Sequence, residues 1–510
     1  MANSSTNNKR IAKNTILLYI RMFFIMVVTL FTSRVVLNTL GVVDFGIYNV
    51  VGGVVSMMGV LNGAMSVSTT RYLTFELGRG DKLQLRIVFS TCLTIFIILS
   101  AIVILLAESV GLWFLNSKLV IPEDRMVAAN WVYQFAIFSS VSSLMTNPYN
   151  ATIIAHERMN IYAYVGILEV LLKLGVAYLL LVMPTDRLAT YGVLILLSHV
   201  IVTSIYIIYC LRHFAETHYK FYWEKPLVKE LVSYSGWNLF GSVSDLVKGQ
   251  GLNILLNIFF NPAVNAARGI AYQINSAITQ FFTNFYTAVR PQITKYYAQG
   301  NVEDMMKLVF RSSKFSFYLI MFISMPIVIE TPFLVNLWLG QLPDYVVPFT
   351  RLIIIISAVD SMSTPLMTVA HATGNIRFYQ FSVGTMKILN LPISYIFLKL
   401  GYSPLVIFYI SLAISSICLF MRVWIVRRLM PFPVKAYIVQ VFGSCLLVNL
   451  VALIVPITAN LLLDNSIGNV VIICLLCVLS SLTAIYGIGF NAIEREFTIS
   501  IIRKKIFKRK

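Results

Sequence analysis

Charged residues are scarce in this chain, and their scarcity excludes a soluble globular protein. Only 12% of the 510 residues are Asp, Glu, Lys or Arg, whereas 58% are hydrophobic and the mean hydropathy is +0.80. Soluble domains carry about 25% charged residues. Apolar runs of roughly 20 residues recur along the chain, which is the length of a helix that crosses a bilayer. The runs are continuous rather than alternating, so the sequence predicts an all-α polytopic membrane protein and not a β-barrel.

Residues that bind metals or activate nucleotides are also few. The 5 histidines are scattered, and the 6 cysteines lie mostly in apolar segments. Cys474 and Cys477 have a spacing that metal sites use, but neither a second pair nor a histidine accompanies them. The chain has no Walker A loop, which excludes ATP hydrolysis by a P-loop. We therefore expect no enzyme, no metal and no cofactor, and we leave open a coupling to an H⁺ or Na⁺ gradient or to the membrane potential.

The apolar runs predict about fourteen transmembrane helices. We expect them at 12–38, 43–69, 87–110, 127–150, 160–183, 189–211, 233–260, 263–289, 312–331, 345–371, 377–399, 404–427, 436–460 and 467–490. Because this number is even, both termini are expected on the same side of the membrane.

Basic residues outnumber acidic ones, 40 to 21, and most of them fall in loops on one side of the predicted membrane. Loops rich in Lys and Arg face the cytoplasm. We therefore expect a multi-pass protein of the bacterial inner membrane with both termini cytoplasmic. This topology accounts for the net charge of +19 without nucleic-acid binding. The basic tail 491–510 fits either an ordinary anchor or an amphipathic helix on anionic phospholipid.

Several short motifs occur twice, roughly 220 residues apart, which indicates an internal duplication. The matching segments are 37–47 and 256–270, 80–89 and 300–310, and 155–161 and 370–376. The repeat contains six helices, an even number, so the two copies have the same orientation and a pseudo-twofold axis along the membrane normal. The expected divisions are an N-terminal lobe 1–211, a cytoplasmic linker 212–231, a second lobe 232–428, two further helices within 429–490 and the tail 491–510.

Several basic residues fall inside predicted helices, where an unpaired charge is costly and usually functional. Arg21, Arg34 and Arg268 have no acidic residue at helical spacing on their own helix. Arginine stays charged and binds phosphate through two parallel hydrogen bonds. If their helices meet, these arginines line a cationic cavity that fits a phosphate-bearing substrate.

The acidic residues inside predicted helices leave a second interpretation open. Asp44, Asp245 and Asp360 are either charge partners of the buried arginines or sites that couple transport to an ion. Arg422 lies near the cytoplasmic end of its helix, so we expect its side chain to extend to the membrane surface.

Two further pairs can neutralise themselves on a single helix face. Glu169 and Lys173 are four residues apart, and Asp245 and Lys248 are three apart. Residues at these spacings are neighbours on a helix surface. Both pairs are therefore candidates for local salt bridges, and for Lys248 this alternative stands beside a role in substrate binding.

Three segments carry a resemblance to a known family. They read NKRIAKNTILLYIRMFF at 8–24, LNTLGVVDFGIYNVVGGVV at 37–55 and STTRYLTFELGRGD at 68–81. The chain resembles the polysaccharide transporter family, the bacterial Wzx-type flippases for O-antigen and capsule repeat units. That family belongs to the multidrug/oligosaccharidyl-lipid/polysaccharide exporter superfamily, with the lipid II flippase and the multidrug and toxin extrusion (MATE) antiporters.

The resemblance implies two lobes in a V shape that alternate between inward-open and outward-open states. The implied cargo is an undecaprenyl-pyrophosphate-linked oligosaccharide, moved from the cytoplasmic to the periplasmic leaflet. By position, Arg21, Arg34, Arg268 and, with a weaker match, Lys248 correspond to cations that bind the pyrophosphate. Helices at 436–490 correspond to a groove for the lipid tail. The polysaccharide polymerase and other proteins of the pathway are implied partners.

Two rival functions remain. A MATE-type cation or drug antiporter has the same fold, but its cavity is expected to be acidic. A membrane polysaccharide polymerase or ligase also has many helices, but it is expected to carry a large periplasmic loop, and the external loops predicted here are short. Substitution of the basic residues inside the helices would distinguish these functions, because it should abolish transport of an anionic cargo but not of a cationic one.

Overall fold

The computed structural model shows an all-helical membrane protein. It describes residues 2–56, 59–118, 121–183, 186–260, 262–339, 343–464, 466–492 and 494–496. These ranges contain seventeen α-helices, and 10 helical segments are long and apolar enough to cross a membrane. The predicted class, an all-α polytopic membrane protein, is confirmed. The other four predicted spans, 43–69, 127–150, 233–260 and 263–289, are also helical where the structure describes them, although they are not among the 10.

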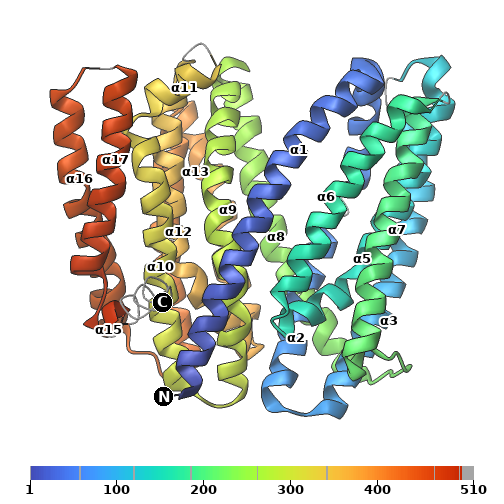
Figure 1. Ribbon diagram of the computed structural model, residues 1–510, viewed down its shortest axis with the longest axis horizontal. Coiled ribbons are helices and arrows are strands. Elements are labelled where there is room, and N and C mark those ends of the chain that lie inside the picture. The colour runs from blue at the N-terminus through green and yellow to red at the C-terminus, as the bar shows by residue number, and fades with distance from the viewer. Residues whose placement is uncertain are drawn as a thin grey trace, which may run out of the picture. The chain divides into compact units, whose positions relative to one another are not determined.

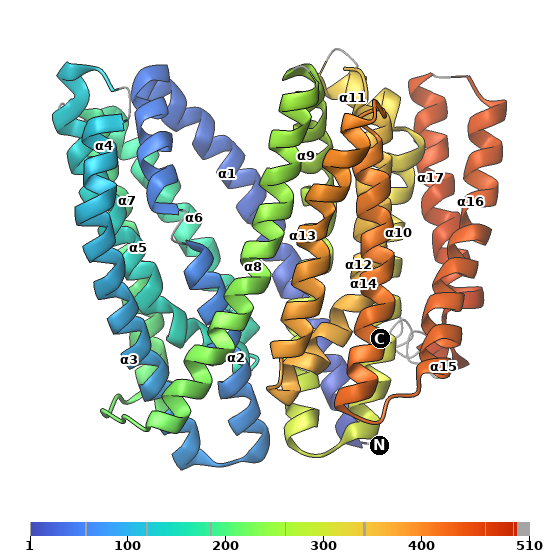
Figure 2. The same cartoon turned by 180° about the vertical axis from the view of Figure 1, so that it is seen from behind.

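One compact unit comprises Met1–Val243 and Thr294–Asn301. Within it α5 packs on α7, α2 and α3, while α1 packs on α6, as the two opposite views show (Figure 1, Figure 2). Short turns of π-helix and 3₁₀-helix connect some of these elements. The helices are α1 (Ala2–Ser56), α2 (Gly59–Arg79), α3 (Lys82–Leu106), α4 (Leu112–Lys118), α5 (Met126–Ala155), α6 (Met159–Val182) and α7 (Arg187–His213).

The long helix α1 contains the boundary that the sequence predicts between its first two spans. Gly41 has φ +79° and ψ 168°, which is not helical, and it lies between the predicted ends at 38 and 43. Positive φ strains an L residue but not glycine. The first predicted span and the beginning of the second therefore lie in α1 as two helical segments that meet at a kink, and the end of the second span lies in α2.

The second compact unit comprises Ser244–Ile293 and Val302–Lys510. Here α12 packs on α14 and α10, and α16 and α17 form an antiparallel pair whose member α17 contacts α10 (Figure 1). The helices that begin in or enter this unit are α8 (Lys225–Phe259), α9 (Pro262–Ala298), α10 (Val302–Ile329), α11 (Thr331–Leu339), α12 (Val346–Thr373), α13 (Arg377–Lys399), α14 (Val406–Leu429), α15 (Val434–Tyr437), α16 (Ser444–Leu462) and α17 (Ile467–Ala484).

The duplicated motifs adopt the same local structure at both positions. Gly80 follows α2 with φ +79°, and Gly300 follows α9 with φ +70°. Glycine commonly ends a helix in this left-handed conformation, where a side chain would cost energy. His156 directly follows α5, and His371 lies in the last turn of α12. The motif matches found in the sequence therefore mark equivalent helix ends.

Candidate functional site

The acidic residue of α1 has a basic partner that the sequence did not reveal. Arg125, which directly precedes α5, donates from Nε to Oδ1 of Asp44 at 2.8 Å and also bonds the second carboxylate oxygen. The same guanidinium bonds Asp186 at 2.7 Å. Burial opposes ionisation of Asp186, but hydrogen bonds from the backbone N–H of Ala189, from Arg125 and from the backbone N–H of Leu188 outweigh it and lower its pKa below the usual value.

The predicted salt bridge between Asp245 and Lys248 is not formed, because Asp245 has a different partner. Asp245 forms its salt bridge with Lys387 of α13, at 2.7 Å. Lys248 is half-buried and has Asp245, Asp360 and Lys387 as electrostatic neighbours, but it forms no salt bridge within the described part of the chain. The structure thus brings two other predicted site residues of the second unit, Asp245 and Asp360, close to Lys248.

The expectation that Arg422 extends to the membrane surface is also wrong. Its side chain is buried, with 6% of the residue exposed, and it donates to the hydroxyl oxygen of Tyr379 at 3.2 Å and to Ser363. Its salt bridge with Asp360 spans 3.5 Å. Asp360 therefore has a partner on α14 that is close to it in space and distant in sequence.

The predicted local pair on α6 is present. Lys173 donates to Glu169 at 2.7 Å. With the pairs above, Asp44, Glu169, Asp245 and Asp360 are each held by a basic side chain. The electrostatic cost of burying a carboxylate is thereby offset.

Three of the predicted basic site residues have no such partner. Arg21, Lys248 and Arg268 form no salt bridge among the residues that the structure describes. The backbone of Arg34 lies in α1, but its side chain lies outside the described residues. The helices therefore contain cations whose charge is not cancelled by an ion pair.

Arg268 is held by neutral oxygen atoms. It is 9% exposed, and it donates to the carbonyl oxygen of Gly249 at 2.8 Å and to Oδ1 of Asn253 at 3.1 Å. Its guanidinium carbon lies 4.4 Å from the ring centre of Tyr272. These contacts satisfy hydrogen-bond donors and add a cation–π interaction, yet they leave the positive charge in place.

Arg21 borders a polar cavity of about 440 Å³ within the first unit. Its guanidinium carbon lies 4.3 Å from the ring centre of Tyr162, and its Nε atom is buried without a hydrogen-bond partner in the structure. Gly166 of α6 makes room for it, because a Cβ atom there would lie 2.3 Å from that Nε. The cavity is otherwise lined largely by amide and hydroxyl side chains, among them Asn62, Ser143, Asn147, Asn150 and Thr203.

The second unit has an apolar cavity of about 400 Å³ among α10, α12, α14 and α16. Phe317 and Met321 line it from α10, and Leu419 lines it from α14. Phe442 lines it from the π-helical turn Ile438–Gly443, and Leu446 from α16. This cavity includes part of the predicted lipid-tail region 436–490.

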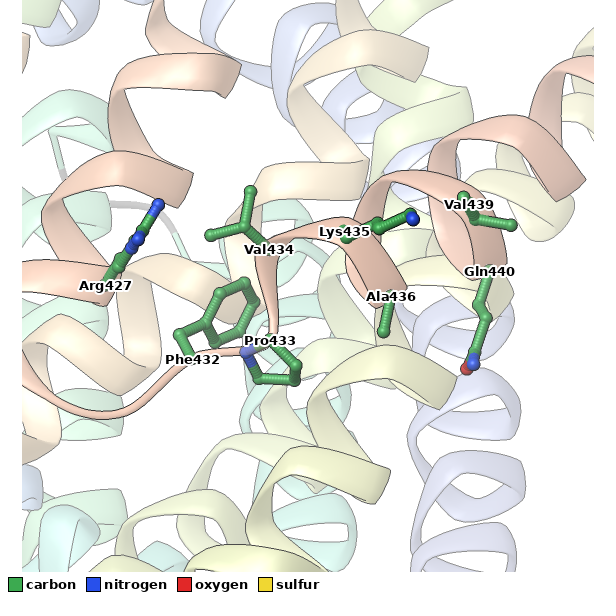
Figure 3. A pocket seen from close by; sticks show the side chains of 8 residues that line it. All are labelled: Arg427, Phe432, Pro433, Val434, Lys435, Ala436, Val439 and Gln440. Carbon is green, nitrogen blue, oxygen red and sulfur yellow. The ribbon is translucent and has the colours of Figure 1, made fainter.

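A further pocket, of about 660 Å³, lies where α14 ends and α15 begins. Figure 3 shows Arg427 and Lys435 on either side of Val434, with Phe432 and Pro433 between the two helices. Nearby, Arg428 stacks over Trp424 at 4.4 Å. Exposed arginine and lysine beside tryptophan are typical of the headgroup region of a membrane. Of the predicted lipid-binding tail 491–510, residues 493 and 497–510 lie outside the described residues.

Comparisons with known proteins identify the fold. No family model matches the chain, and no curated protein matches it. Among solved structures, a multidrug resistance MATE family transporter of the MOP superfamily in an outward-facing conformation has a TM-score of 0.69 at 15% identity, covering 84% of this chain and 96% of that one. A MATE structure in a bent conformation has a TM-score of 0.71 at 15% identity, with coverage of 84% and 96%.

A MOP superfamily transporter from Pyrococcus furiosus Vc1 (DSM3638) has a TM-score of 0.64 at 15% identity, covering 83% of this chain and 96% of that one. Its description states that reverse polarity of the binding pocket suggests a different function. Similarity at such low identity rests on the arrangement of the helices. The chain therefore has a MATE-like fold, similar to that of these membrane transporters.

Proposed function

We propose that this protein is a flippase that moves an undecaprenyl-pyrophosphate-linked oligosaccharide from the cytoplasmic to the periplasmic leaflet of a bacterial inner membrane by alternating access. One observation carries the proposal. Asp44, Glu169, Asp245 and Asp360, which lie inside the helices, are each paired with a base, whereas Arg21, Lys248 and Arg268 form no salt bridge among the described residues. The charge left over among these seven residues is positive, which suits an anionic cargo.

The diphosphate is the part of this cargo that cannot cross hydrocarbon unaided. Transfer of an unpaired charge into a low-dielectric medium costs far more than a protein can offset by burial of apolar surface. Arginine meets this need, because its planar guanidinium stays charged and matches phosphate oxygens in pairs. Arg268 is already desolvated and held by neutral oxygens, so binding a diphosphate requires little further loss of hydration.

The lipid portion of the cargo requires an apolar surface. The cavity among α10, α12, α14 and α16 offers one, lined by phenylalanine, methionine and leucine side chains within the membrane-spanning region. Burial of each CH₂ group there contributes about 0.8 kcal/mol relative to water. A polyprenyl chain gains no free energy by moving from the bilayer into this cavity unless the diphosphate is bound as well. In the proposal, the apolar cavity and the arginines that bind the diphosphate therefore act together.

The second candidate is a cation or drug antiporter, and the fold supports it because solved structures of similar fold are MATE transporters. A cationic drug needs unpaired acidic groups at its site. Asp44, Asp245 and Asp360 are instead bound by Arg125, Lys387 and Arg422. The charge balance therefore favours the flippase.

The test is translocation by the purified protein in vesicles. A fluorescent undecaprenyl-pyrophosphate oligosaccharide is placed in both leaflets, and an impermeant quencher reports exchange between them. We expect wild-type protein to exchange the probe, and Arg34→Ala and Arg268→Ala to lose most of that activity. Arg34→Lys and Arg268→Lys should lose less, since they keep the charge without the paired hydrogen bonds. Arg212→Ala, at an exposed arginine of the last turn of α7, is the matched control.

Two results would contradict the proposal. Wild-type exchange in both alanine variants would show that these arginines are structural. Uptake of a cationic dye by the same vesicles, without exchange of the lipid-linked sugar, would support the antiporter. In cells that lack the protein, the flippase predicts that completed lipid-linked units accumulate on the cytoplasmic leaflet, out of reach of the polysaccharide polymerase, while surface polysaccharide disappears.

A further inference from the structure

The polar cavity of the first unit is unusual for its position. Small-molecule sites of roughly 300–1,000 Å³ are mostly apolar with a few polar groups. This cavity of about 440 Å³ has the opposite lining, although α6 and α7, which contribute to it, are both candidate membrane spans. Polar groups at such depth are costly and are retained for function. The lining therefore points to a ligand with many hydrogen-bonding groups.

Two residues that line the cavity each have a buried polar atom without a hydrogen-bond partner in the structure. These atoms are Nε of Arg21, a donor, and Oδ1 of Asn150, an acceptor, and both are buried. An unsatisfied buried polar atom costs about 1–3 kcal/mol, so such atoms are normally paired. A ligand that supplies an acceptor to Arg21 and a donor to Asn150 removes both costs.

Other amides of the cavity are fixed by one another. Nδ2 of Asn147 donates to the carbonyl oxygen of Asn62 at 3.3 Å and to its side-chain oxygen, and Nδ2 of Asn62 approaches Ser143 at 3.4 Å. Thr203 bonds Thr146 at 2.6 Å. Such a network holds donors and acceptors in place before the ligand arrives. Amide and hydroxyl groups each offer both donor and acceptor capacity, as sugar hydroxyls do.

The charges of the cavity add a second requirement. Glu169 lines it, but Lys173 neutralises that carboxylate at 2.7 Å. Arg21 has no salt bridge among the described residues, and Tyr162 and Gly166 fix the position of its guanidinium. The site therefore places one uncancelled positive charge beside a surface of neutral hydrogen-bonding groups.

We propose that this cavity recognises the sugar residue that is attached to the diphosphate, with a phosphoryl oxygen on Arg21 and sugar hydroxyls on Asn150 and the neighbouring amides. The ligand class is a sugar 1-phosphate, the common chemical unit of lipid-linked saccharides. The inference rests on the proposed function and adds to it, because it assigns sugar selectivity to side chains of a single unit. A site built from paired amides rejects a sugar that lacks the matching hydroxyl, since its own groups then stay unpaired.

The experiment measures binding to the purified full chain through its thermal stabilisation. The probes are glucose 1-phosphate, galactose 1-phosphate, N-acetylglucosamine 1-phosphate, the corresponding free sugars and inorganic pyrophosphate. We expect at least one sugar 1-phosphate to bind more tightly than the others and than pyrophosphate. Asn150→Leu should weaken the binding of that sugar 1-phosphate by roughly tenfold and leave the binding of pyrophosphate unchanged, because only the acceptor for the sugar is lost. Arg21→Gln should weaken the binding of both probes.

Asn116→Leu is the matched control, since Asn116 lies on α4 in the same unit, exposed and outside the cavity. Equal stabilisation by all sugar 1-phosphates and by pyrophosphate would overturn the proposal and would indicate a water-filled anion pocket. Retention of the sugar preference in Asn150→Leu would overturn it as well. Translocation of the lipid-linked probe in vesicles separates the two inferences: if it persists without sugar preference, only the sugar site fails, and if it is absent, the flippase fails.

Discussion

The contact between Gly166 and Arg21 leads to a sharp prediction. A Cβ atom at Gly166 would lie 2.3 Å from Nε of Arg21 and 3.0 Å from its guanidinium carbon. Heavy atoms do not approach this closely, so Gly166→Ala must displace the guanidinium. Gly175, on the same helix, has nothing within 4 Å of the corresponding position. Gly175→Ala is therefore a control that changes the same helix in the same way without contacting Arg21.

The magnitude follows from two opposing effects. Alanine in place of glycine within a helix stabilises by about 0.5–1 kcal/mol, because glycine loses more backbone entropy on folding. Overpacking a closely packed position costs about 1–3 kcal/mol. We expect Gly175→Ala to be neutral or stabilising and Gly166→Ala to be destabilising, with a difference of about 1–3 kcal/mol between them. Translocation by Gly166→Ala should fall toward that of Arg21→Ala.

The assay is a double-mutant cycle, with unfolding of the purified protein and translocation in vesicles as readouts. In the background of Arg21→Ala the obstructing side chain is gone, so Gly166→Ala should behave like Gly175→Ala. The coupling between the two positions should therefore equal most of the effect of Gly166→Ala alone. Equal effects of Gly166→Ala in both backgrounds would refute the packing of Arg21 against α6.

Three further predictions concern the remaining charges. Arg125→Gln should lower stability by about 1–3 kcal/mol, because it leaves the carboxylate of Asp44 unpaired, and adding Asp44→Asn should recover part of the loss in thermal unfolding. Burial alone would raise the pKa of Glu216, but hydrogen bonds from His156 and from a backbone N–H hold that pKa below 4.5. The ionised Glu216 therefore stabilises the folded protein fully above about pH 4.5, and this contribution is lost as pH falls through the lowered pKa. Glu216→Gln should therefore flatten stability in acid titrations, and a retained slope would contradict this. Lys435→Glu should reduce the anionic phospholipid that co-purifies with the protein, as measured by mass spectrometry, if the pocket beside α15 binds headgroups.

The helices could be predicted closely because their signal is local. Hydropathy fixed a span at 377–399, and α13 is Arg377–Lys399. The pair of Glu169 and Lys173 was predictable for the same reason, because a spacing of four residues decides it. The kink at Gly41 was also visible as a break between two apolar runs. In each case a short stretch of sequence contains all the information.

The charge partners could not be predicted, because they depend on tertiary packing. Arg125 and Asp44 are separated by 81 positions, and Lys387 and Asp245 by 142. Helical spacing suggested Lys248 as the partner of Asp245, but Asp245 forms its salt bridge with Lys387 on α13. Arg125 also looked like an ordinary loop residue. Its position directly before α5, opposite the acidic residues Asp44 and Asp186, emerges only when the helices are assembled.

These tertiary pairs decide how the cations should be interpreted. A carboxylate beside Arg268 would have stabilised its burial and cancelled its charge at the same time. The structure instead places a backbone carbonyl, an asparagine oxygen and a tyrosine ring there, which stabilise the guanidinium and preserve its field. Meanwhile Asp245 and Asp360 are each held by another base. Burial of an uncancelled charge lowers stability, and charges inside membrane helices usually mark a functional site. The surroundings of Arg268 therefore support the proposal of an anionic cargo.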